Sequence, residues 1–403
     1  MQQRIIIIGA GFAGMYAALS AARLRDLEGV SPEQLEIVLV APEPVLVIRP
    51  RLYEPKPETL TAPLRDVLDA VEVVYVQGRV EKLDTQARII EVIPAAGRPQ
   101  PMAYDRLVLA TGSELFRPGI PGLSEHGFSV DKLADAIALD RHLQALAGLP
   151  ASEARDTVVV AGGGFTGIEV ATEMPGRLSA ILGKDAKPRV VIVERNASVA
   201  PDMGAGPRPL IEKALGDLGI EARVGLGVAG VDKDGVTLSD GSRIGSMTLI
   251  WAAGMRAAAL TAQVPAERDN AGRLIVDRAL RVPGVAGVLA TGDAAKAACD
   301  DIGNFALMSC QHATRMGAFA GHNAAAELLG APTQAYHQAA YVTCLDLGAA
   351  GAIFTRGWDR KVEMTGTKAK QTKQEINTVW IYPPRPERAA ALASAEPARV
   401  TDL

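Results

Sequence analysis

The sequence has few cysteines and no strong excess of charge of either sign. Only three of its 403 residues are cysteine, and these stand apart at Cys299, Cys310 and Cys344. They lack the C-x-x-C spacing of zinc sites and predict no framework of structural disulfides, which is typical of a reducing cytoplasm. The formal net charge of −4 offers no broad basic surface for nucleic acid, so we expect no nucleic-acid partner.

Long apolar runs are also absent from the sequence. No stretch approaches the roughly 20 apolar residues that a helix needs to span a bilayer. A strand is expected as early as Ile5, which leaves no room for a signal peptide, so the expected location is the cytoplasm. The apolar content of 48% and charged content of 22% are ordinary for a globular protein. A chain of 403 residues predicts two or three domains with ample core.

A run of four isoleucines that ends in a glycine turn opens the chain. Residues 4–14 read RIIIIGAGFAG, which predicts a strand buried on both faces and then a helix over residues 15–24. Gly9, Gly11 and Gly14 have the G-x-G-x-x-G spacing. In this motif the glycines permit a tight turn, the approach of a pyrophosphate and close packing of the helix, whose N-terminus stabilises phosphate charge. The stretch therefore predicts a dinucleotide site.

The same plan returns in the middle of the chain. Residues 157–160 read TVVV, and Gly162, Gly164 and Gly167 follow before a helix expected from Ile168. A second echo lies in two later strand ends, LVLATG at residues 107–112 and LIWAAG at residues 249–254. Two copies of one supersecondary plan predict an α/β fold of two Rossmann-like domains with β insertions, followed by a small C-terminal cap.

Further elements are expected around these two units. The patterns predict strands at 35–40, 71–80, 87–93, 104–113 and 190–193, a hairpin at Asp240-Gly241, helices at 131–146 and about 306–329, and a frayed tail at 385–403.

The order of the motifs GAGFAG, LATGS, GGGFTGIE, WAAG and ATGD resembles the two-dinucleotide-binding-domain flavoproteins over residues 1 to about 330. Within that group, RPRLYE at 49–54, GGGFTGIE at 162–169 and CQHATRMG at 310–317 are most similar to the type II NADH dehydrogenase family, with the sulfide:quinone oxidoreductases as more distant relatives. The resemblance implies an enzyme, an FAD-dependent NAD(P)H oxidoreductase, that passes hydride from NADH to FAD and then electrons to a quinone or quinone-like acceptor.

The resemblance also implies where each cofactor binds. An FAD domain would comprise residues 1–125 and 282–330, an NAD(P)H domain residues 126–281, and a C-terminal cap residues 331–403. The implied FAD contacts are Gly9, Gly11, Gly14, Thr111, Gly112, Gly292 and Asp293, and those of the nicotinamide nucleotide are Gly162, Gly164, Gly167, Glu194 and Gly254. The first unit has Ala41 where an acid usually binds the ribose of the adenosine, and Glu43 is the candidate substitute.

Glu194 ends the second strand of the second unit, where an acid accepts hydrogen bonds from both ribose hydroxyls and repels a 2′-phosphate. We therefore predict a preference for NADH, while Arg195 beside it leaves NADPH as an alternative.

Two residues are candidates for catalysis. Glu169 is expected in the first turn of its helix, where it either stabilises the helix N-terminus or, as the resemblance implies, relays a proton near the flavin. Gln311 begins a match to the family's AQxxxQ quinone pattern, in which Cys310 replaces the alanine and Arg315 the second glutamine. The alternative is that this helix only packs on FAD. No metal site is expected, and His312 and His322 are interpreted as packing or surface residues.

The sequence leaves open both the electron acceptor and whether the protein contacts a membrane. Residues 361–373 form a basic run, which we interpret as a solvated surface in preference to a contact with the cytoplasmic face of a membrane. The acceptor is then a small molecule such as a quinone. Alternatives are an electron-transfer or tailoring reductase, a redox-sensing binder, and a sulfide:quinone-like enzyme that uses Cys310 and Cys344. A homodimer is a further alternative to a monomer.

Overall fold

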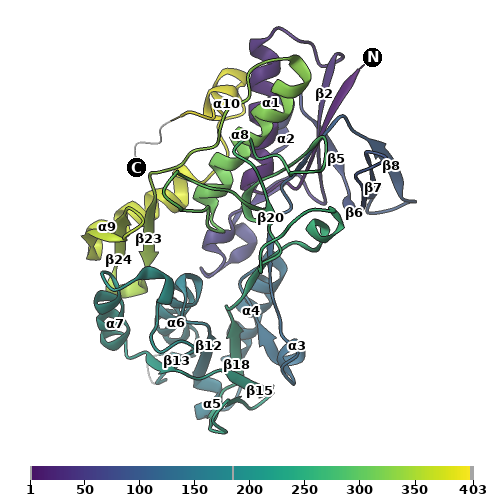
Figure 1. Ribbon diagram of the computed structural model, residues 1–403. Helices are drawn as coiled ribbons and strands as arrows, with labels where there is room; N and C mark the ends of the chain where they lie inside the picture. Colours follow the sequence, from purple (N-terminus) through teal and green to yellow (C-terminus); the bar gives the residue numbers. More distant parts are fainter. Residues whose placement is uncertain (1, 184–185, 400–403) are drawn as a thin grey trace.

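The computed structural model describes residues 2–183 and 186–399 (Figure 1). Its first sheet is wholly parallel, with the strand order β21-β9-β1-β2-β5. Ile5, Ile6 and Ile7 of the central strand β1 are fully buried because helices and loops cover both faces of the sheet. The strands are β1 (Gln3–Ile8), β2 (Leu35–Ala41), β5 (Val74–Gln77), β9 (Arg106–Leu109) and β21 (Val288–Ala290).

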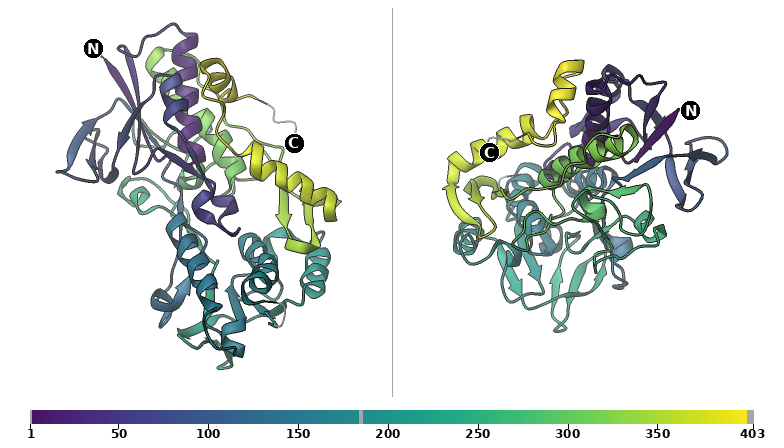
Figure 2. Two further views of the ribbon diagram at one scale, coloured as in Figure 1. Left: turned by 180° about the vertical axis from the view of Figure 1, so that it is seen from behind. Right: turned by 45° about the horizontal axis from the view of Figure 1, so that its top comes forward.

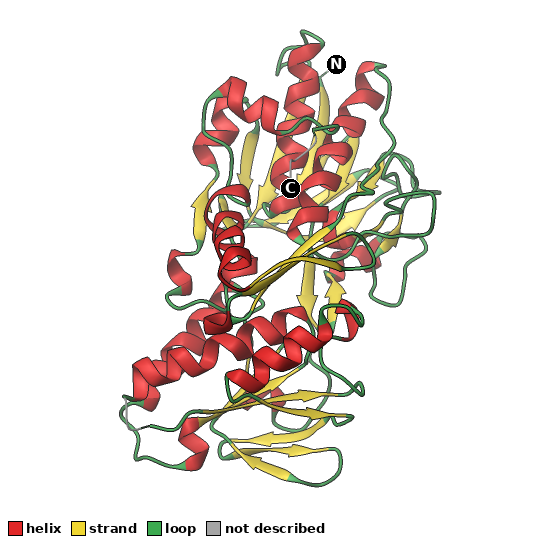
Figure 3. Cartoon of the chain, turned by 90° about the vertical axis from the view of Figure 1, so that its left-hand side faces the viewer, coloured by secondary structure: helices red, strands yellow, loops and turns green. Residues whose placement is uncertain are grey.

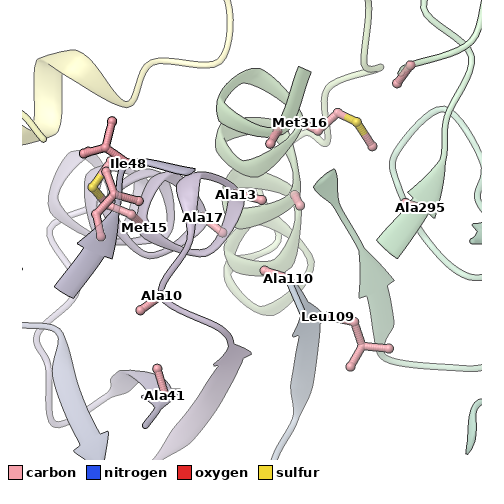
Figure 4. Close-up of a cluster of buried hydrophobic side chains, with 14 of the residues drawn as sticks. Ala10, Ala13, Met15, Ala17, Ala41, Ile48, Leu109, Ala110, Ala295 and Met316 are labelled. Carbon is pink, nitrogen blue, oxygen red and sulfur yellow. The ribbon is translucent and has the colours of Figure 1, made fainter. Parts of the chain in front are cut away.

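Helices α1 (Phe12–Leu27) and α8 (Cys310–Leu329) lie side by side against this sheet (Figure 4). A Cβ atom added at Gly317 would overlap the carbonyl oxygen of Ala13, and one at Gly321 would overlap that of Ala17. Figure 4 shows Ala13 and Ala17 on the side of α1 that faces α8. Small residues on both helices therefore permit a close backbone approach, which fixes the first turn of α1 against α8.

The second sheet is also parallel, with the order β11-β18-β12-β13-β14. Its strands are β11 (Gly127–Phe128), β12 (Thr157–Ala161), β13 (Arg189–Glu194), β14 (Glu221–Val224) and β18 (Thr248–Trp251). Helices α4 (Leu133–Leu146), α6 (Phe165–Leu182) and α7 (Arg208–Asp217) pack around it, and Figure 3 shows this layer below the first one. The chain crosses between the sheets through β10 (Ser113–Leu115) and β19 (Met255–Ala257), which pair antiparallel.

Small antiparallel sheets and short helices complete the two layers. The predicted hairpin at Asp240-Gly241 is confirmed, since β16 (Gly235–Leu238) and β17 (Arg243–Gly245) pair antiparallel across it. The remaining elements of these layers are β3 (Val45–Val47), β4 (Thr61–Pro63), β6 (Arg79–Asp84), β7 (Ile89–Ile93), β8 (Gln100–Ala103), β15 (Val228–Asp232), β20 (Leu274–Ile275), β22 (Ala295–Lys296), α2 (Arg65–Ala70), α3 (Leu123–His126) and α5 (Glu153–Asp156).

The C-terminal segment lies along both layers (Figure 2). It forms the antiparallel strands β23 (Val342–Asp346), β24 (Ala352–Arg356) and β25 (Lys361–Thr365), and then helix α9 (Gly366–Glu375). A π-helical turn at Ile376–Trp380 continues α9, and helix α10 (Arg388–Ser394) returns to pack on α1. This segment places the side chains of α9 beside the second layer and those of α10 beside the first.

Four expectations about these elements were wrong in detail. Residues 385–399 are not frayed, because Ala391 and Ala395 of the α10 region are fully buried and Arg388 binds Asp26 (2.7 Å); residues 400–403 lie outside the described part. Helix α8 begins at Cys310 and not near residue 306, because the backbone runs extended to Ser309, whose hydroxyl caps the helix. The stretch 71–80 splits between β5 of the main sheet and β6, and the stretch 104–113 splits between β9 and β10.

Candidate active site

The first glycine turn follows β1 at the carboxyl edge of the first sheet. Gly9 has a φ of +109°, and a Cβ atom there would overlap the carbonyl oxygen of Ala110. A Cβ at Gly14 would likewise overlap the Gly9 carbonyl, whereas Gly11 and Gly112 face open space. The turn is thus closely packed at Gly9 and Gly14 and open at Gly11, which fits a pyrophosphate lying on the backbone at the N-terminus of α1.

Polar groups without protein partners surround this turn. Among the described residues, the hydroxyl oxygens of Thr111 and Thr291 are buried and have no hydrogen-bond partner. They follow β9, which lies beside β1, and β21, which lies beside β9. Since a buried hydroxyl without a partner is costly, these two groups fit the polar atoms of a bound FAD. Gly292, at a φ of +60°, brings the next backbone segment against Ala13.

The first glycine turn, Thr111, Thr291 and Gly292 together form what we call the FAD cradle. Asp293 is its acidic group. Its carboxylate accepts a hydrogen bond from Ser113 Oγ (2.5 Å) and lies 3.6 Å from Arg49 Nη1. Burial raises the pKa of this carboxyl, and the contacts with Ser113 and Arg49 oppose that rise. Arg49 also binds Asp131, so it joins the cradle to the segment that enters the second layer. The sequence motif RPRLYE gave no indication of these particular partners.

Glu43 stands in a different environment. It is exposed in the loop after β2, where Ala41 lacks a carboxylate and its carbonyl accepts from Tyr75 Oη (2.6 Å). A contact between Glu43 and the adenosine ribose stays a prediction.

The second glycine turn repeats the geometry of the first. Gly162 has a φ of +114°, a Cβ at Gly167 would overlap the Gly162 carbonyl, and Gly164 faces open space. Gly254 follows β18, the strand beside β12, at a φ of +82°. The turn therefore offers a second seat for a pyrophosphate at the N-terminus of α6.

Glu194 lies directly against this turn. Its Oε2 accepts from Gly163 N (2.7 Å), and its Oε1 accepts from Asn196 N (2.8 Å) and Asn196 Nδ2 (2.6 Å). The residue is 7% exposed, so three donors hold the carboxylate in one orientation. Asn196 was not singled out from the sequence, although an amide two residues after a strand-end acid is a local signal that could have found it.

Glu169 lies in a buried ion pair. It sits in the second turn of α6 and not the first, since the helix already begins at Phe165. Glu169 Oε1 accepts from Lys373 Nζ (2.7 Å) and from Asp346 N (3.0 Å), and the side chains of Glu169 and Lys373 are only 5% and 6% exposed. Burial raises the pKa of the Glu169 carboxyl, and Lys373 opposes that rise. For Lys373, burial acts to lower the pKa, but Glu169, Cys344 and Asp346 together raise it above its ordinary value.

The basic run at 361–373 is therefore not simply a solvated surface. Lys373 is 5% exposed, and Lys370 binds Asp346 (2.5 Å). The interpretation failed because a charge pattern in sequence does not show which lysines face a buried carboxylate. Lys361 and Lys368 are exposed, as expected.

The N-terminus of α8 carries Gln311. Its Oε1 lies 3.5 Å from Val342 N, a long contact that leaves the amide weakly held. Arg315, expected to replace a quinone-binding glutamine, instead donates to the carbonyls of His337 (3.1 Å) and Arg399 (2.7 Å). These contacts hold backbone segments on α8, so they do not support a role for Arg315 in binding a quinone.

The histidines and cysteines have structural surroundings. His312 is fully buried against the rings of Tyr341 and Trp358, and burial lowers its pKa to about 3, which confirms packing. His322 is buried as well. All three cysteines are free, and burial raises the pKa of Cys310 to about 11 and of Cys344 to about 12. Both are protonated thiols at neutral pH, which disfavours thiolate chemistry of the sulfide:quinone type.

Within 2–183 and 186–399, no group of three or more His, Cys, Asp or Glu side chains is placed to hold a metal ion. In the same ranges, none of the helices has the length and apolar character needed to cross a bilayer.

Comparisons with known proteins agree with this geometry. The family model described as pyridine nucleotide-disulphide oxidoreductase matches residues 3–317. The NADH dehydrogenase-like protein Rv1812c of Mycobacterium tuberculosis is 47% identical over 98% of both chains, and the demethylphylloquinone reductase NdbB of Synechocystis is 27% identical over 87% of this chain and 86% of its own. Among solved structures, NDH2 from Plasmodium falciparum in complex with NADH has a TM-score of 0.79 at 16% identity, covering 98% of each chain.

The predicted fold class and family are thus confirmed. The family's description includes disulphide chemistry, but the free cysteines of this chain supply no redox disulfide at either glycine turn. The two glycine turns, the cradle around Asp293 and the matched family model lead to one conclusion: the chain belongs to the pyridine nucleotide-disulphide oxidoreductase family and is an oxidoreductase that uses FAD and NADH.

Proposed function

We propose that the protein oxidises NADH and reduces a quinone, with FAD bound at the first glycine turn and NADH at the second. The observation that carries this proposal is the buried Glu169–Lys373 pair, because it joins the two parts of the site. Glu169 belongs to α6, the helix that follows the second glycine turn. The ammonium of Lys373 is also close enough to lower the pKa of the Cys310 thiol at the N-terminus of α8.

The pair supplies what quinone reduction needs from side chains. Reduction of a quinone by NADH consumes one proton, since NADH, a quinone and H⁺ give NAD⁺ and a quinol. Bound FAD supplies the hydride acceptor and the two-electron donor of this reaction. Glu169 accepts a hydrogen bond from the Lys373 ammonium in a buried environment, and burial raises the pKa of this carboxyl, so the pair is suited to hold and transfer a proton. Gln311 is the proposed amide donor toward a quinone carbonyl.

Relatives support the choice of acceptor. The Synechocystis relative is named for the reduction of a quinone, and it aligns with most of this chain. The acceptor of this chain stays a proposal, because a shared fold serves many acceptors.

The second glycine turn supports NADH over NADPH. Gly163 and Asn196 hold the Glu194 carboxylate against the turn, where a ribose would lie. A 2′-phosphate placed there would meet this carboxylate, so we propose NADH as the donor and NADPH as a poor substitute.

A contact with a membrane surface is part of the proposal. Val379 and Trp380 end the π-helical turn after α9 with exposures of 65% and 42%. An exposed aromatic and aliphatic pair of this kind fits the headgroup region of a lipid bilayer, from which a lipid-soluble quinone enters. Co-sedimentation with vesicles, compared between the natural chain and Trp380→Ser, tests the contact. A homodimer stays a prediction for light scattering.

A panel of acceptors tests the central proposal. The protein is reduced by NADH under anaerobic conditions and mixed in a stopped-flow instrument with a short-chain quinone, oxygen, a ferredoxin or a disulfide. We expect the quinone to restore the oxidised flavin spectrum fastest. Faster reoxidation by the ferredoxin or the disulfide would contradict the proposal and favour an electron-transfer or disulfide reductase.

A further inference from the structure

A second ion pair lies beside the Glu169–Lys373 pair. Lys370 and Lys373 are one turn apart on α9, and Lys370 Nζ lies 2.5 Å from Asp346 Oδ1. The Asp346 side chain is 7% exposed and that of Lys370 is 26% exposed, whereas the first pair is almost sealed. One helix therefore brings two lysines to two carboxylates, and only the Lys370 end has substantial contact with water.

Asp346 connects the two pairs through both its backbone and its side chain. Its N–H donates to Glu169 Oε1 (3.0 Å). Its side chain accepts from Lys370, from Tyr53 Oη (3.1 Å) and from Gly348 N (2.9 Å). Because the side chain is held from three directions, the N–H that reaches Glu169 is held as well.

We propose that Asp346 is a positioning residue for Glu169, and that Lys370 and Tyr53 hold it in that role. The inference rests on the proposed function, since it concerns the carboxyl that is proposed to hold the proton. It goes beyond that function, because it gives a role to Asp346 of β23, Lys370 of α9 and Tyr53 of the segment before β4.

The signs of the charges give this arrangement a testable signature. The N–H of Asp346 lowers the pKa of Glu169, whereas the negative charge of the Asp346 side chain raises it, and Lys370 offsets that charge. Loss of the Asp346 charge should therefore lower the pKa of Glu169, and loss of the Lys370 charge should raise it. Other titratable groups near this cluster are Glu54 beside Tyr53, Glu173 and Arg177 of α6, Lys373 of α9, Cys344 of β23 and Cys310 of α8.

The test is a pH titration of the Glu169 carboxyl by infrared difference spectroscopy on the FAD-bound protein. The C=O band of the protonated acid is assigned by its loss in Glu169→Gln. We expect Asp346→Asn to lower the apparent pKa and Lys370→Met to raise it, each by roughly one pH unit. The double variant should titrate close to the natural protein. Lys368→Met, an exposed lysine on the same helix, is the matched control and should change nothing.

Tyr53→Phe is a milder substitution that tests the same network if one of the charge variants fails to fold. It removes one donor to Asp346 and should raise the apparent pKa by less than Lys370→Met does. Shifts in the same direction for Asp346→Asn and Lys370→Met, or no shift in either, would overturn the inference. The result does not depend on the acceptor, so opposite shifts in a protein that reduces no quinone would refute the proposed function alone.

Discussion

Replacing Lys373 by methionine should destabilise the protein in a way that depends on pH. Methionine retains the length and much of the volume of the lysine, so the change removes a charge and little packing. Lys373 and Glu169 are 6% and 5% exposed in their side chains, and the substitution leaves the Glu169 carboxylate buried without its cation. Removing one partner of a buried pair costs about 3–5 kcal/mol. We expect a loss in this range at pH 8.

The loss should shrink in acid. Burial raises the folded-state pKa of Glu169 above its value in the unfolded chain, and without Lys373 nothing comparable opposes that rise. A group of this kind contributes stability below its unfolded pKa and loses it as the pH rises through the folded pKa. At pH 5 the carboxyl of the variant takes up a proton and is buried as a neutral acid, so the deficit should fall to about 1–2 kcal/mol.

Guanidinium unfolding followed by tryptophan fluorescence at pH 5 and pH 8 measures the effect. Lys368→Met should match the natural protein, and Glu169→Gln with Lys373→Met should recover most of the lost stability because no buried charge remains. An equal loss at both pH values, or no recovery in the double variant, would show that the unpaired Glu169 charge is not what destabilises Lys373→Met.

Three further predictions concern the two turns and the C-terminal helix. Glu194→Gln should lower kcat/KM for NADH about tenfold and reduce the preference for NADH over NADPH, because a neutral amide loses one charge-assisted contact with the ribose. Steady-state kinetics with both nucleotides checks this. Gly317→Val should cost about 2–3 kcal/mol and lower the FAD content of the purified protein, since the new side chain meets the carbonyl of Ala13. Gly216→Ala, at a helical glycine that faces open space, is its control. Ala391→Asp should cost about 3 kcal/mol and expose residues near 385 to limited proteolysis, because it places a charge at a fully buried site under α10.

Local patterns were sufficient to predict the two glycine turns. The run Ile5–Ile8 and the spacing of Gly9, Gly11 and Gly14 specify a buried strand, a turn and a helix within a dozen residues. The same logic placed Glu194 at a strand end. These features depend on backbone geometry over short distances, which residue type and spacing describe well.

Contacts between distant segments could not be predicted in the same way. Lys373 is 204 positions from Glu169, and the interpretation of its basic run as solvated surface was reasonable without that partner. Likewise Arg388 and Ala391 lie in an alanine-rich stretch that reads as a frayed end, and they are ordered by Asp26 and the surface of α1. In both cases tertiary packing supplies partners that no local pattern contains.

We infer that the two glycine turns of this chain bind FAD and NADH so that NADH reduces the flavin. Anaerobic titration of the purified protein with NADH, followed at the flavin absorbance band, tests it most directly. We expect a yellow protein that bleaches with one equivalent of NADH per bound FAD. A protein that stays colourless after incubation with FAD, or that keeps its flavin absorbance when NADH is added, would contradict it.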